Sequence, residues 1–190
     1  KAMSGHSIDG NTWQTKLERI GKLATQDPET VFNNLGHLIT IEMLRDLYSQ
    51  LAGNKAIGTD NVTKEAYGEN LEENLKNLMK DVRKGTYRPK PSRITEIPKE
   101  DGSLRPLAIS CFEDKLIQSA VSKILSTIFE PLFLSCSYGA RPDRNCHDAL
   151  RALNQHNWRA WDGGTVEIDI RKYFNTIPHK ALNECLKKKI

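Results

Sequence analysis

The stretch TVEIDIRKYFNTIPH, residues 165–179, is the one around which the rest of the chain can be interpreted. Apolar and polar residues alternate through its first half, the period-2 pattern of a strand with two different faces. The apolar members are Val166, Ile168 and Ile170. Asp169 lies near the end of this predicted strand, and the aromatic residues Tyr173 and Phe174 follow it. A carboxylate there can hold a hard cation and an aromatic can pack against a nucleotide, but a solvated edge strand has the same pattern.

Composition excludes several classes of protein. The chain has 190 residues, enough for one domain or one and a half, with 38% hydrophobic and 27% charged residues, as in a soluble globular protein. No apolar run approaches the roughly 20 residues of a membrane span. Residues 1–12 lack the apolar middle of a signal peptide and are interpreted as a flexible leader or a remnant of cloning. The four cysteines form no CxxC pair, which disfavours a zinc site and indicates reduced thiols in a cytosolic protein.

Basic residues are concentrated between residues 76 and 93. The net charge of the whole chain is only +4, but this stretch contains a single acid, Asp81. Its basic members are Lys76, Lys80, Arg83, Lys84, Arg88, Lys90 and Arg93. Such density suits a polyanion-binding surface, although a solvated helix face is the more common outcome for a charged run.

Helical spacing of apolar residues predicts most of the chain to be helical. The predicted helices cover residues 13–24, 41–52, 64–84, 112–133 and 146–158, with a last one that begins at Pro178. Thr40, Thr63 and Asn145 are the expected N-caps, and Gly85 is the expected stop. The helix at 112–133 has a wide apolar face and is expected to be well buried.

One β-hairpin is predicted in the middle of the chain. Residues 93–98 and 104–109 are short strand candidates joined through Asp101-Gly102, a strong turn signal. Lys99 and Arg105 flank the turn. They are either ordinary charges on a solvated tip or a pair of cations that closes over phosphates.

Four segments in order resemble the reverse transcriptases encoded by group II introns, also called intron maturases. The segments are FNNLGHLIT (32–40) with KAIGTDNVT (55–63), GTYRPKPSRITEIPKEDGSLRPLAI (85–109), IFEPLF with SYGARPDRNCHDAL (137–150), and EIDIRKYFNTIPH (167–179). The resemblance runs from about Phe32 to the last residue, and four blocks in the right order make chance similarity improbable.

The resemblance implies an α+β fold of the right-hand polymerase type. Mostly helical fingers with a β-hairpin would be followed by the start of the palm sheet, truncated. The implied divisions are residues 13–62 for the N-terminal extension and first finger helices, 63–160 for the fingers, and 161–190 for a partial palm.

The family's activity is RNA-directed DNA synthesis, and the resemblance implies a role for each matching residue. Asp169 would be the catalytic carboxylate and a ligand of Mg²⁺, two ions of which serve the complete enzyme, together with the backbone carbonyl of Ile170. Lys99 and Arg105 would grip the triphosphate. Phe174 would be the gate that excludes a ribose 2′-hydroxyl.

Tyr138, Gly139, Arg141 and Arg144 resemble template-contacting positions of the family. The basic surface described above would follow the RNA backbone, and its candidate RNA-binding residues are Lys80, Arg83, Lys84, Arg88, Lys90 and Arg93. The implied partners are group II intron RNA, template–primer RNA/DNA and dNTPs, with no membrane, in a bacterial-type cytoplasmic ribonucleoprotein. An exposed partial palm, or the fingers, also suggests a homodimer.

The chain departs from the family pattern at several places. Ile57, Thr59 and Asn61 replace three residues of the usual Pro-Gly-Ile-Asp-Gly, Asn175 stands where Asp is common, and Ala140 where an aromatic is common. No Asp-Asp pair occurs, so the Tyr-x-Asp-Asp motif of the family is absent. We therefore expect a chain that stops within the palm and has no polymerase activity alone.

Two other functions fit the same residues. The region can serve as an RNA-binding splicing cofactor without chemistry of its own. It can also belong to a retron or diversity-generating reverse transcriptase, although the FNNLGHLIT-like extension argues against that.

Overall fold

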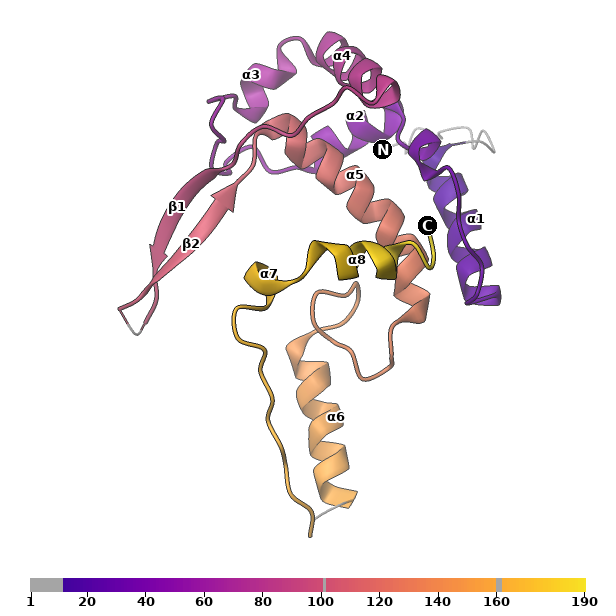
Figure 1. The fold of residues 1–190 in the computed structure, drawn as a ribbon, viewed down its shortest axis with the longest axis vertical. Helices are drawn as coiled ribbons and strands as arrows, with labels where there is room; N and C mark the ends of the chain where they lie inside the picture. Colours follow the sequence, from indigo (N-terminus) through magenta and orange to yellow (C-terminus); the bar gives the residue numbers. More distant parts are fainter. Residues whose placement is uncertain (1–11, 101, 160–161) are drawn as a thin grey trace, which may run out of the picture. The chain divides into compact units, whose positions relative to one another are not determined.

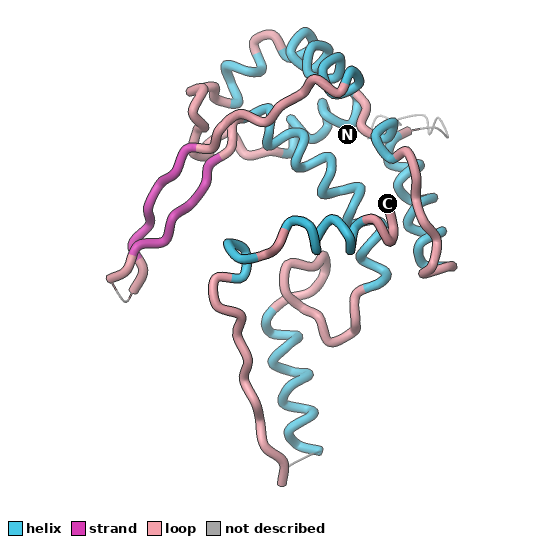
Figure 2. The backbone as a smooth tube through the Cα atoms, viewed as in Figure 1, coloured by secondary structure: helices cyan, strands magenta, loops and turns pink. Residues whose placement is uncertain are grey.

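The computed structural model describes residues 12–100, 102–159 and 162–190, so the predicted leader, residues 1–12, lies almost entirely outside them. The described chain is mostly helical with one antiparallel hairpin, which confirms the α+β prediction at that level (Figures 1 and 2). The elements are α1 (Trp13–Gln26), η1 (Leu35–Leu38), α2 (Ile41–Gln50), α3 (Lys64–Gly68), α4 (Leu71–Lys84), β1 (Arg93–Pro98), β2 (Leu104–Ile109), α5 (Phe112–Phe129), η2 (Glu130–Leu132), α6 (Cys146–Arg159), α7 (Tyr173–Thr176) and α8 (His179–Leu186).

The chain divides into two compact units. The first contains the described residues up to Ile20 together with Asn34–Ser126, and the second contains Gly21–Asn33 and Thr127–Ile190. Among the described residues, no helix combines the length and the apolar character that crossing a membrane requires.

Local sequence signals begin and end the helices as expected. Thr40 and Thr63 accept hydrogen bonds through their side chains from Met43 N and Ala66 N, both at 3.1 Å. Asn145 Oδ1 accepts from Asp148 N at 3.0 Å at the start of α6. Gly85 ends α4 in the left-handed region, with φ of 69°, which a glycine adopts without steric cost.

The core of the first unit forms where α2, α4 and α5 bury their apolar stripes. Within the first unit, the apolar side chains of these helices at or below 4% exposure are Met43, Leu44, Leu47, Leu75, Leu78, Met79, Leu116, Ala120 and Ile124. An aromatic cluster adds to this core, since the Phe112 ring lies 5.8 Å from that of Tyr48 and 5.1 Å from that of Tyr67. Burial of such side chains is the main source of stability in a unit of this size.

The prediction of one long helix from Thr63 to Gly85 is wrong. The structure has two helices, because Asn70 leaves the helical region with φ of −125° and ψ of 41°. Gly68, a poor helix former, ends α3 just before this break. Asn74 stabilises the corner by donating from Nδ2 to Tyr67 O at 2.9 Å.

The helix predicted over 112–133 is shorter and less buried than expected. It ends at Phe129, and Pro131 lies in the 3₁₀ turn η2 that follows. The stripe that includes Leu116 and Ala120 is buried, but Val121 on the neighbouring stripe is 39% exposed. One apolar face of α5 therefore contributes to the core and the second does not.

The strand predicted at residues 166–170 is also absent. Residues 164–170 have no regular secondary structure (Figure 2). Val166 and Ile168 are 82% and 84% exposed. A strand needs hydrogen bonds from a neighbour, and the only strand pair among the described residues is β1 with β2.

Gly58 allows the loop after α2 to approach the start of α5. A Cβ at this position would lie 2.6 Å from Cys111 Cα and 2.8 Å from its backbone N, and backbone atoms cannot move aside cheaply. We predict that Gly58→Ala lowers the free energy of unfolding by about 1 to 3 kcal/mol, the usual range for overpacking.

Gly36→Ala is the matched control, because nothing lies within 4 Å of a Cβ at Gly36. Urea unfolding measures both variants. Equal losses of stability would contradict the close approach at Gly58.

Candidate functional site

The register of the hairpin brings three cations to one face. Arg105 lies opposite Ile97, and Arg93 lies opposite Ile109. The pairing continues one residue further, since Lys99 N donates to Ser103 O at 2.8 Å. Directly opposite residues of the two strands lie on the same face of the hairpin, and so does every second residue along each strand. Arg93, Lys99 and Arg105 therefore lie on one face. The hairpin therefore has a cationic face.

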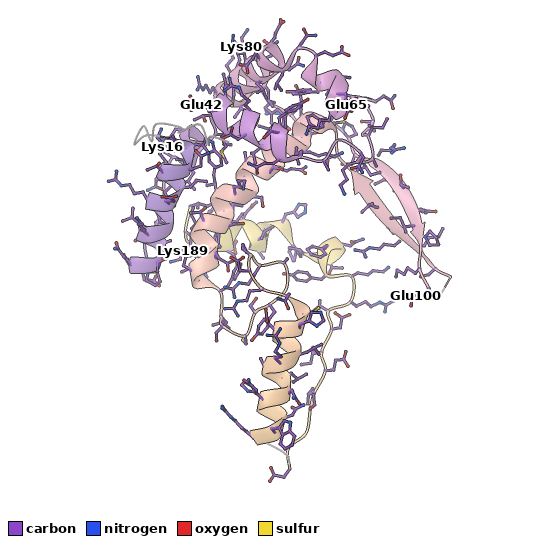
Figure 3. All side chains as sticks on the ribbon, turned by 180° about the vertical axis from the view of Figure 1, so that it is seen from behind. Lys16, Glu42, Glu65, Lys80, Glu100 and Lys189 are labelled. Atoms are coloured by element: carbon purple, nitrogen blue, oxygen red, sulfur yellow. The ribbon has the colours of Figure 1, made fainter. Side chains whose placement is uncertain are left out.

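The two cations near the turn have no partner in the part of the chain that the structure describes. Among the described residues, neither the Lys99 ammonium nor the Arg105 guanidinium makes a hydrogen bond or ion pair, whereas Arg93 donates from Nε to Ile57 O at 3.0 Å. In Figure 3, Glu100 marks the far end of the hairpin, away from the helices of the first unit. Two cations on an exposed arm can accept a phosphate chain from solvent.

The basic residues of α4 face outward, as predicted. Lys76, Lys80, Arg83 and Lys84 are exposed, while Leu75, Leu78 and Met79 on the opposite face are buried. Figure 3 shows Lys80 projecting from this helix. Lysines four residues apart on a helix are separated by about 6 Å, close to the spacing of successive phosphates in an extended nucleic acid strand.

Three other predicted RNA contacts are engaged by the protein itself. Arg93 bonds Ile57 O, and Arg88 Nη1 donates to Gly85 O at 3.0 Å. Lys90 Nζ lies 3.0 Å from Asp60 Oδ2. Burial alone would raise the pKa of the Asp60 carboxyl, but hydrogen bonds, led by that from Lys90, hold this pKa below its usual range. These side chains hold loops together, and their contact with RNA stays a prediction.

Arg141 fastens the loop after η2. Its side chain is 8% exposed, and its Nη2 lies 2.7 Å from Glu130 Oε1. Nη1 donates to the carbonyls of Leu134 and Ser137 at 2.9 and 3.0 Å, and the guanidinium lies 5.3 Å from the centre of the Phe133 ring. Sequence reasoning assigned Arg141 to template contact and did not anticipate this internal role.

The neighbouring residues are more accessible. Arg144 donates to Ser135 O at 2.8 Å, and its guanidinium lies 5.3 Å from the centre of the Tyr138 ring. Gly139 is exposed, with nothing within 4 Å of a Cβ placed there. Ala140 has φ of 55°, a left-handed turn that reverses the chain next to Gly139. An open backbone beside a cation and an aromatic ring suits a nucleic acid strand.

Asp169 and Ile170 lie in an exposed segment of the second unit. The described residues contain no group of three or more His, Cys, Asp or Glu side chains that could hold a metal ion. The Asp169 carboxylate and the Ile170 carbonyl supply oxygen donors, the type that magnesium prefers. Their role as ligands of a metal ion stays a prediction.

Phe174 lies in the short helix α7 just after Asp169. It is 86% exposed, and its ring packs edge-on against Tyr173 with centroids 5.4 Å apart. Lys172 begins this turn in the left-handed region, with φ of 51°. An aromatic ring so exposed is available to a ligand.

Asp114 is a buried polar residue that the candidate site residues predicted from the sequence do not include. It is 3% exposed and accepts two hydrogen bonds. One sequence signal was available: Asp114 falls at helical spacing on the stripe of Ile117 and Val121, and an acid on an apolar stripe usually has partners.

Comparison with known proteins gives consistent results. The family described as "Reverse transcriptase (RNA-dependent DNA polymerase)" matches residues 97–189. The chain is 36% identical over 170 residues to the group II intron-encoded protein LtrA of Lactococcus lactis subsp. cremoris, covering 87% of this chain and 28% of that protein. It is 31% identical over 183 residues to protein YkfC of Escherichia coli (strain K12), covering 90% of this chain and 47% of that one.

A third similar protein is also named for an intron. The uncharacterized 91 kDa protein in cob intron of Schizosaccharomyces pombe is 31% identical over 180 residues, covering 92% of this chain and 22% of that protein. The chain thus spans less than half the length of each of these relatives.

The internal role of Arg141 can be tested by conservative replacement. We predict that Arg141→Lys destabilises the second unit by about 1 to 3 kcal/mol, because an ammonium cannot satisfy the planar set of acceptors. Arg151→Lys is the control, since Arg151 is 73% exposed in its pair with Asp148 and should change stability by less than about 0.5 kcal/mol. Thermal unfolding measures both, and equal effects would contradict the assignment.

Proposed function

Because the chain belongs to the family of group II intron-encoded reverse transcriptases, we propose that it forms the fingers and the start of the palm of an RNA-directed DNA polymerase. The enzyme would copy intron RNA into DNA and bind the same RNA to assist splicing. In this proposal residues 63–160 are fingers and residues 161–190 begin the palm.

The cationic face of the hairpin is the observation that carries the proposal. Lys99 and Arg105 share one face, project from an exposed arm, and have no partner among the described residues. A triphosphate brings several oxygen acceptors and a high negative charge to such a face. Charge-assisted hydrogen bonds to it would orient the nucleotide for attack by a primer hydroxyl.

Asp169 and the carbonyl of Ile170 would hold magnesium. When bound, the metal stabilises the charge that develops on the transferred phosphate and on the leaving pyrophosphate. The oxygen donors fit this ion, and its remaining positions suit water and phosphate oxygens. The protein contributes a carboxylate next to an exposed aromatic residue.

Phe174 would act on the sugar of the incoming nucleotide. Its ring is exposed and fixed against Tyr173, five residues after Asp169. A rigid ring packed on the sugar leaves no room for a 2′-hydroxyl, which would favour deoxynucleotides by steric exclusion.

The outward face of α4 and the loop around Tyr138 would bind RNA. Lys80, Arg83 and Lys84 are exposed cations on one helix, and Arg144 adds a cation beside an aromatic ring. Contacts of this kind bind the phosphate backbone with little sequence preference. They also favour the RNA-binding splicing role as a second function of the same protein.

Replacement of Asp169 separates the two functions. In the full-length gene product, we predict that Asp169→Asn lowers the rate of nucleotide addition by at least about a hundredfold, because a metal ligand is lost, while the Kd for intron RNA stays unchanged. Primer extension and filter binding measure these quantities. Asp162→Asn, another exposed acid of the segment, should affect neither. An equal loss of RNA binding would refute this division of roles.

The α4 surface can be tested by the salt dependence of RNA binding. Replacing Lys80, Arg83 and Lys84 together by Gln should reduce the slope of log K against log salt by about 2, since each phosphate contact contributes about 0.7 for a single strand. Replacing three exposed cations elsewhere, Arg151, Lys187 and Lys188, removes the same charge and should leave the slope nearly unchanged. Equal slopes in the two variants would argue against a specific α4 surface.

A further inference from the structure

Asp114 is a buried acidic residue whose two carboxyl oxygens each accept a hydrogen bond. In the described part of the chain it is the charged residue that the fold buries, at 3% exposure in the first turn of α5. Oδ1 accepts from the Tyr87 hydroxyl, and Oδ2 accepts from Lys90 N at 3.1 Å. Burying a carboxylate is costly unless such bonds compensate, so its position calls for an explanation.

Both donors belong to the connection that leads from α4 into β1. This connection contains Pro89 and Pro91, which have no backbone N–H. Lys90 therefore offers the one backbone donor across residues 89–91, and that donor goes to Asp114. Burial and then the hydrogen bond to Asp114 raise the pKa of the Tyr87 hydroxyl, which keeps it protonated as a donor.

The loop after α2 holds the same connection from another side. Thr59 Oγ1 donates to Pro91 O at 2.8 Å, and Lys90 Nζ lies 3.0 Å from Asp60 Oδ2. The segment is thus tied to two elements at the point where the hairpin begins.

Asp114 also lies close in sequence to the other end of the hairpin. β2 ends at Ile109, five residues before Asp114, and the chain passes directly into α5. The Asp114 side chain, which follows β2, therefore accepts a hydrogen bond from the backbone N–H of Lys90, three residues before β1 begins. This bond closes the base of the hairpin outside its last pair, Arg93 with Ile109.

We propose that Asp114 is a positioning residue that sets the direction of the hairpin and, through it, the places of Lys99 and Arg105. The inference rests on the proposed function, since it assigns those two cations to the triphosphate. Asp114 itself touches no substrate. Small displacements at the base of an arm become larger at its tip, and a misplacement of about 1 Å can cost up to a hundredfold in rate.

The test uses the full-length gene product and steady-state primer extension. Asp114→Asn keeps the size of the side chain but presents an amide N–H₂ to one of two donors. We expect it to raise the KM for dNTP about tenfold while the Kd for template–primer stays unchanged. Hydrogen–deuterium exchange should be faster at the Lys90 amide in this variant.

Glu113→Gln is the matched control. Glu113 lies in the same helical turn and also accepts from a tyrosine hydroxyl, that of Tyr67 at 3.2 Å, but Tyr67 lies in α3 and not in the hairpin connection. The KM for dNTP should stay unchanged in this variant. Tyr87→Phe is the second variant, which keeps the proposal testable if Asp114→Asn fails to fold. It removes one of the two hydrogen bonds to Asp114 and should raise the KM for dNTP by less than Asp114→Asn does.

A double-mutant cycle separates positioning from general stability. Lys99→Ala should raise the KM for dNTP, and adding Asp114→Asn to it should raise the KM further by clearly less than the roughly tenfold rise expected in the wild-type background, because part of the effect of Asp114 passes through Lys99 and part through Arg105. If Lys99→Ala leaves the KM unchanged, the proposed function of the hairpin fails. If Lys99→Ala raises it but the Asp114 effect is absent, fully additive or matched by Glu113→Gln, the positioning role is overturned.

Discussion

The connection between α4 and β1 cannot hold itself in place, and the geometry of the hairpin depends on how it is held. Its prolines remove backbone donors, and none of its residues belongs to a helix or strand. A carboxylate that accepts a backbone N–H in a buried site forms one of the stronger hydrogen bonds available. Asp114 supplies it, and Thr59 and Asp60 add ties from the loop after α2. This part of the first unit is therefore shaped by side-chain contacts between segments far apart in the sequence.

Much of the fold could be predicted because its signals act over a few residues. The caps at Thr40 and Thr63, the stop at Gly85 and the ends of both strands follow from local chemistry and are where they were expected. The shared face of Lys99 and Arg105 follows in the same way, since hairpin register is set by a short turn.

The remaining features could not be predicted because they depend on distant partners. The alternation at Val166–Ile170 is typical of a strand, but these residues form none. A strand requires a hydrogen-bonded neighbour, which the local sequence pattern cannot supply. The break at Asn70 is the exception, since it follows from local backbone conformation and not from a distant partner. Arg141 has an ordinary loop context, and the apolar stripe beside Asp114 indicates only that this acid has partners. The positions of those partners show that each residue is an internal anchor.

The closed base of the hairpin has a consequence for how its three cations are ordered. Arg93, beside the base, is already bonded to Ile57, whereas Arg105 and Lys99 lie progressively nearer the turn. Immobilising a long cationic side chain costs up to about 2 kcal/mol of conformational entropy, so this cost is concentrated toward the tip. A phosphate chain bound on this face would contact an already ordered side chain, Arg93, near the base of the hairpin. Nearer the turn it would contact Arg105 and Lys99, which binding would have to order.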